Sequence, residues 1–166
     1  MSAFDLAWSI LKMPIYETGI PGIRFVTQGE DEPRWEEQDN VYGYAPRDPS
    51  GGQGDIQNVT PAEFGMMTTG RAKGGIYGEE GEYSPREVAA KYEPGSEDYD
   101  MFNYYRALMD RAEAGEDILF GMPYVFRDHH PDMYHEGRHR MAELFARGHG
   151  DTPLPVKVMR GTHGYR

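Results

Sequence analysis

Cysteine is absent from this chain of 166 residues, and its absence excludes several kinds of chemistry. Without thiols the protein cannot form disulfides, thiolate zinc sites or cysteine-ligated iron–sulfur clusters, and it has no cysteine nucleophile. The sequence also lacks any apolar run near the ~20 residues that a membrane helix needs. Its first residues show no basic leader followed by an apolar run and a cleavage site. We therefore expect a cytoplasmic protein with no membrane partner.

Basic residues are scarce, and the shortage is confined to one part of the chain. There are 17 Lys and Arg against 28 Asp and Glu, which gives a formal net charge of -11. Residues 1–100 hold 19 acidic and 8 basic side chains, whereas residues 101–166 hold 9 of each. Binding along a DNA duplex needs many Lys and Arg side chains to displace counterions. The charge therefore disfavours DNA as a partner of the whole protein, but it leaves room for a local basic site.

The composition predicts one small domain with much irregular structure, because only 38% of the residues are hydrophobic and there are 21 Gly and 12 Pro. We expect an α/β (α+β) fold with a small mixed sheet and short helices. Residues 1–95 should be loop-rich and acidic, and residues 96–160 should form the core. Within the first part, a capping box with proline at the first helical position opens a predicted helix. The elements predicted there are helices at residues 3–13, 61–67 and 85–92, strands at 23–26 and 56–59, and a long loop at 29–54.

The last third of the sequence is the most regular. A helix should run from Ser96 to Gly115, and Met141, Leu144 and Phe145 fall on one face of another helix. A glycine, Gly137, stands between a strand and this second helix, which is typical of α/β sites. Apolar and polar residues alternate in the final strand. The predicted order is a helix at 97–114, strands at 124–126 and 134–135, a helix at 138–147 and a strand at 155–159.

The best candidate site is this glycine turn. A helix N-terminus carries unpaired N–H groups and positive potential, so anions bind there. Arg138 and Arg140 have guanidinium groups suited to phosphate, and His139 adds a titratable donor. We predict phosphate binding by Gly137, Arg138, His139 and Arg140, with Glu136 and His139 as candidate catalytic residues. An alternative stays open, in which the two arginines and His139 form only the solvated face of an amphipathic helix.

A second polar cluster precedes the turn, and its residue types suit zinc, manganese or iron. It consists of Asp128, His129, His130, Asp132 and His135. The spacing matches no established metal motif, and Pro131 indicates a turn in which polar residues are common without any metal. If a divalent metal binds, we expect His129, His135 and Glu136 to hold it beside the phosphate site.

Several of these residues resemble a known superfamily. Residues 136–142, Glu-Gly-Arg-His-Arg-Met-Ala, and residues 154–158, Leu-Pro-Val-Lys-Val, resemble the ParB/sulfiredoxin-like fold superfamily. Its members have a G-x-x-R segment at a helix start and a later Pro-Val strand. The resemblance covers about residues 96–160. With the Thr-Pro-x-Glu-Phe segment at residues 60–64, the chain is more particularly similar to ParB-like proteins of phages and mobile elements.

The resemblance implies a function for the glycine turn. In that superfamily the G-x-x-R turn binds nucleotide phosphates, so the implied ligand of Gly137, Arg138, His139 and Arg140 is a nucleoside triphosphate with Mg²⁺. Sulfiredoxins have a cysteine where this chain has Arg138, which excludes their thiol chemistry. Partition-type ParB proteins have Arg-rich boxes and continue into helix-turn-helix domains, whereas this sequence ends soon after its last predicted strand. We therefore do not expect a segregation clamp.

Three functional hypotheses follow. The first is a ParB-like nucleotide-binding protein that hydrolyses or transfers phosphate, with Glu136 as metal ligand or base; if phage-encoded, it would work in the host cytoplasm. The second is a non-catalytic, virion-associated or mobile-element protein that uses the fold as a scaffold and binds a protein partner. The third is a metal-dependent nuclease that uses the His and Asp cluster, although the negative net charge counts against it.

Overall fold

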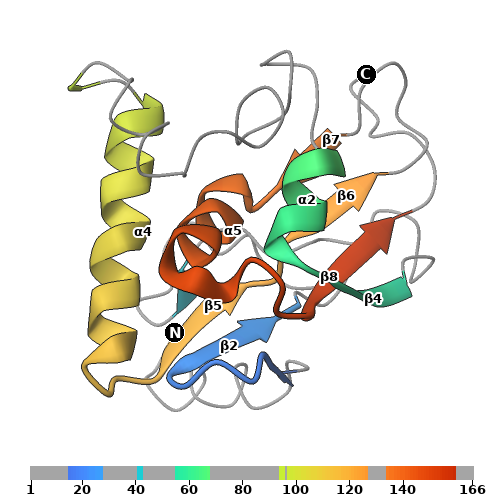
Figure 1. Ribbon diagram of the computed structural model, residues 1–166, viewed down its shortest axis with the longest axis horizontal. Helices are drawn as coiled ribbons and strands as arrows, with labels where there is room; N and C mark the ends of the chain where they lie inside the picture. The colour runs from blue at the N-terminus through green and yellow to red at the C-terminus, as the bar shows by residue number, and fades with distance from the viewer. Residues whose placement is uncertain are drawn as a thin grey trace, which may run out of the picture.

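The computed structural model describes residues 15–27, 41–42, 55–67, 94–95, 97–126 and 134–159. These residues form two small four-stranded sheets. Helices pack against the sheets, as Figure 1 shows. The α+β class predicted from the sequence is confirmed, but the strands are divided between two sheets where one was expected. The predicted helices at residues 3–13 and 85–92 lie outside the described residues.

The first sheet has the strand order β1-β2-β5-β3. Its strands are β1 (Ile15–Glu17), β2 (Ile23–Val26), β5 (Ile118–Gly121) and β3 (Val41–Tyr42). β1 is antiparallel to β2, while β5 is parallel to both β2 and β3. The sequence predicted only β2 of these four. β1 and β3 are too short to show a period, and β3 falls within the predicted loop at residues 29–54.

The second sheet has the strand order β4-β8-β6-β7. Its strands are β4 (Asp55–Val59), β8 (Leu154–Met159), β6 (Tyr124–Phe126) and β7 (Tyr134–Glu136), all close to the predicted ranges. The predicted alternation of β8 is wrong, because every side chain of this strand except Lys157 is buried. β8 pairs with β4 on one side and with β6 on the other, so it is a central strand. Central strands are often buried on both faces.

The chain passes from the first sheet to the second between β5 and β6, through Met122 and Pro123. The Met122 amide donates to the Val26 carbonyl at 2.9 Å, and the Lys157 amide donates to the Pro123 carbonyl at 3.0 Å. Pro123 has no N–H group, so it could not continue the β5 ladder. This crossing explains why the apolar run at residues 118–126 forms two strands, whereas the sequence predicted only the second.

In the part of the chain that the structure describes, three α-helices and one π-helical turn cover the sheets. α2 (Pro61–Met67) begins at the predicted capping box, in which the Thr60 amide donates to Glu63 Oε2 at 2.8 Å and the Glu63 amide donates to Thr60 Oγ1 at 3.1 Å. α4 (Glu97–Glu113) matches its prediction. α5 (Arg138–Leu144) is shorter than predicted, because the chain widens into a π-helical turn, η2 (Phe145–His149), that contains Gly148 at φ 90°.

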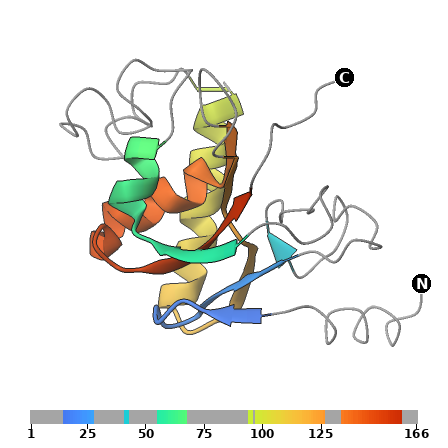
Figure 2. The ribbon, with the colours of Figure 1, turned by 90° about the vertical axis from the view of Figure 1, so that its right-hand side faces the viewer.

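The core lies where α5 packs between α4 and α2, and Figure 2 shows β4 and β8 running beneath α2. Side chains from both sheets and all three helices meet there in one apolar cluster. Its largest fully buried members include Phe25, Phe64, Phe120, Met122, Met141 and Leu144. Among the described residues, no helix has both the length and the apolar character needed to cross a membrane.

Candidate functional site

Gly137 forms the turn between β7 and α5. Its φ of 101° and ψ of 10° lie in the left-handed region, which favours glycine. A Cβ atom at this position would lie 2.8 Å from the Pro123 Cβ and 3.0 Å from an Arg140 Nη2 atom, so there is no space for a side chain. The Met141 amide then donates to the Gly137 carbonyl at 3.0 Å and starts the helical hydrogen bonding. Both the backbone conformation and the packing therefore require glycine.

Arg140 is buried inside the fold, with only 1% of the residue exposed. Its Nη1 donates to the Tyr105 hydroxyl at 2.9 Å and lies 3.8 Å from Glu136 Oε1. The guanidinium carbon also lies 5.5 Å from the centre of the Tyr105 ring, within the range of a cation–π contact. Arg140 thus connects α5 to α4 and to the end of β7.

His139 is also nearly buried, at 9% exposed. Its ring lies 4.8 Å from the Phe102 ring in an edge-to-face contact and is parallel to the Tyr105 ring at 6.3 Å. Both aromatic residues belong to α4. The alternative in which His139 and Arg140 belong to a solvated helix face is therefore wrong. Their polar side chains point toward α4, because α4 packs on the face of α5 that carries them.

Arg138 is the half-buried first residue of α5. Gly137 offers no side chain to cap the first N–H groups of the helix, and the first turn of α5 contains no acidic residue. The start of a helix carries positive potential, so this end of α5 together with the Arg138 guanidinium favours an anion. The Glu136 side chain, on the other side of Gly137, is 31% exposed and supplies a carboxylate suited to a divalent cation.

The predicted metal ligands fall on different parts of the structure. His135 is half-buried and its ring lies 6.0 Å from the Phe64 ring of α2. Glu136 follows directly on β7, where neighbouring side chains point to opposite faces of the sheet. His129 lies outside the described residues. Within the described ranges, no three His, Asp or Glu side chains are grouped closely enough to hold a metal ion, and the predicted metal site stays a prediction.

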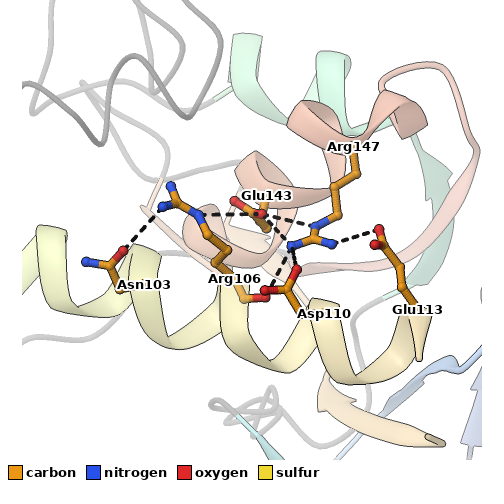
Figure 3. Close-up of polar contacts among 6 residues, drawn as sticks. All are labelled: Asn103, Arg106, Asp110, Glu113, Glu143 and Arg147. Carbon is orange, nitrogen blue, oxygen red and sulfur yellow. Dashed lines mark hydrogen bonds and ion pairs between the residues drawn. The ribbon is translucent and has the colours of Figure 1, made fainter. Parts of the chain in front are cut away.

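A charged cluster that the sequence analysis missed joins α4 to the end of α5 (Figure 3). The Arg147 side chain is only 6% exposed, and its guanidinium lies 2.6 Å from Asp110 and 2.7 Å from Glu113. It lies 3.0 Å from Glu143 and donates to the Arg106 backbone carbonyl at 3.1 Å. Glu143 is buried and lies 4.0 Å from the Arg106 Nε. The cluster holds η2 and α5 against α4.

The electrostatics of Arg147 agree with a structural role. Burial alone would lower the pKa of Arg147, but hydrogen bonds with Glu113 and Asp110 outweigh it and hold that pKa above its usual value. The cation is therefore fixed by carboxylates from two elements. The signal in the sequence was the Glu143 to Arg147 spacing, an i,i+4 pair on one helix.

Comparisons of the chain with models of known protein families, with curated proteins and with solved structures found no match. The resemblance to the ParB/sulfiredoxin-like superfamily therefore stays a prediction, which depends on the glycine turn and the strands around it. What the structure establishes is an α+β fold with two small mixed sheets.

Proposed function

We propose that the turn between β7 and α5 binds the phosphate groups of a nucleotide. One observation supports this most strongly: the half-buried Arg138 and the partly exposed Glu136 flank a glycine turn that the buried Arg140 anchors. Glycine turns that lead into a helix bring backbone N–H groups to phosphate oxygens. The resemblance to ParB-like proteins points to the same ligand.

The burial of Arg140 changes the roles expected within this site. Arg138 is the phosphate ligand in this proposal, because it is the least buried of the three polar residues that begin α5. Arg140 instead stabilises the turn through its hydrogen bond to Tyr105 and its ion pair with Glu136. His139 forms part of the aromatic packing behind the turn. Glu136 is the residue best placed to bind Mg²⁺ together with the nucleotide, or to act as a base in phosphate hydrolysis or transfer.

Isothermal titration calorimetry with ATP, GTP, CTP and UTP, each with and without Mg²⁺, tests this proposal. We expect Arg138→Ala to weaken binding of the preferred nucleotide about tenfold or more, because a charge-assisted hydrogen bond to phosphate contributes roughly 1.5–3 kcal/mol. Arg24→Ala is the matched control. It also removes one partly exposed arginine, but from β2 in the other sheet, where it lies 4.0 Å from Asp117.

Equal losses in the two variants would contradict the proposal, since they would report only the change in net charge. Failure of the wild-type protein to bind any of the four nucleotides would also contradict it. The second hypothesis, a scaffold that binds a protein partner, would then be the better one to pursue.

A further inference from the structure

Two adjacent tyrosines of α4 have opposite environments. Tyr105 is 2% exposed and lies in the core, whereas Tyr104 is 44% exposed. Of the aromatic side chains that the structure describes, Tyr104 is the most exposed. A tyrosine ring at the surface offers a flat apolar face that a ligand can contact, with a hydroxyl at its edge.

The Tyr104 ring is held in a fixed orientation by its neighbours. The Tyr105 ring lies 5.2 Å away in an edge-to-face contact, and the Tyr42 ring of β3 lies 6.3 Å away in a similar contact. Tyr42 is itself fixed, because its hydroxyl accepts a hydrogen bond from Arg111 at 3.3 Å. An exposed ring with fixed neighbours loses little side-chain entropy when a ligand stacks on it.

Ring contacts connect Tyr104 to the first turn of α5. The Tyr105 ring, which touches Tyr104, is parallel to the His139 ring of α5 at 6.3 Å. Burial raises the pKa of Tyr104, with smaller effects from Tyr105 and Tyr42, and the charges of Arg111 and Arg140 oppose the rise. The Tyr104 phenol is therefore neutral at physiological pH and within electrostatic reach of Arg140. Tyr105 lies between it and His139, in contact with both rings.

We infer that Tyr104 is the surface on which the base of the nucleotide stacks while its phosphates occupy the β7–α5 turn. This inference rests on the proposed function and narrows it, because the ligand must carry an aromatic base. Stacking on a tyrosine tolerates any base, since each base offers a flat π-face. In a nucleotide the base and the phosphates are attached to opposite ends of the ribose. A base that stacks on Tyr104, away from the phosphates at the turn, agrees with this arrangement.

The test compares ligands with and without a base on the same protein. Calorimetry measures the binding of ATP, GTP, CTP and UTP and of base-free ribose 5-triphosphate to the wild-type chain. We expect the nucleotides to bind about 5- to 150-fold more tightly than ribose 5-triphosphate. This is the range of affinity expected from the stacking of one base on an aromatic ring. Tyr104→Ala should remove this preference, whereas Tyr104→Phe should keep it. Ile15→Ala, which truncates another exposed apolar side chain at 40% exposure, is the control.

The possible failures can be told apart. Equal affinity of the wild-type protein for nucleotides and for ribose 5-triphosphate would overturn the inference and leave the phosphate site standing. An unchanged preference in Tyr104→Ala would overturn it too, because the base would then bind elsewhere. Absence of binding by all five ligands would overturn the proposed function, and this inference with it. The comparison of ligands needs no variant, so it does not depend on how Tyr104→Ala folds.

Discussion

At the scale of single residues, Gly137 and Gly115 have the same φ of 101° but different surroundings. A Cβ at Gly137 would meet Pro123 at 2.8 Å, whereas a Cβ at Gly115 would meet nothing within 4 Å. We expect Gly115→Ala to cost about 1–2 kcal/mol, the strain of a left-handed residue. Gly137→Ala should cost at least about 1 kcal/mol more, because overpacking adds to the strain. Urea denaturation measures both, and equal losses would contradict the tight packing described for the turn.

The contact between Arg140 and Tyr105 is the second feature at this scale. A hydrogen bond between a buried guanidinium and a hydroxyl should contribute about 1.5–3 kcal/mol. Arg140→Met and Tyr105→Phe each remove the bond while keeping most of the apolar volume. We therefore expect the double variant to be more stable than the sum of the two losses predicts, by about 1–2 kcal/mol in a double-mutant cycle. Additive losses would show that the two side chains do not interact in solution.

At the scale of elements, the ion pairs of Arg147 hold η2 and α5 against α4. Removing a buried partner leaves carboxylates uncompensated, so we expect Arg147→Met to lower the free energy of unfolding by about 2–4 kcal/mol. Arg111→Met removes an exposed arginine that lies 2.7 Å from Glu116 and donates to the Tyr42 hydroxyl, and it should lower stability much less than Arg147→Met. Thermal and urea denaturation compare the two variants. Similar stability of both would contradict the role of the buried cluster.

Elements that depend on interactions between neighbouring residues could be predicted from the sequence. Elements that depend on pairing with distant segments could not. The α2 start was predictable because Thr60 and Glu63 satisfy each other's amides within four residues. The division into two sheets was not, because it depends on pairings between segments far apart, such as β2 with β5. For the same reason, residues 118–126 were predicted to contain one strand and contain two.

The site shows the same limit at the scale of the whole molecule. Its glycine turn was predictable from the strand, glycine and helix order, and Gly137 does have a positive φ. The burial of Arg140 and His139 was not, because a helical period cannot tell whether a polar face meets water or another helix. In this structure the polar face of α5 packs against α4. There Arg140 bonds to Tyr105, and His139 packs on Phe102. Glu143 is buried on α5 for the same reason.

The central claim is that phosphate binds at the β7–α5 turn, and amide chemical shifts of the whole protein test it most directly. In a nitrogen–proton correlation spectrum, titration with the preferred nucleotide should shift the amides of Gly137, Arg138 and His139 most. The amides of β1 and β2, in the other sheet, should stay nearly constant. Saturable binding that leaves the turn amides unshifted, or no shifts at millimolar nucleotide, would contradict the claim.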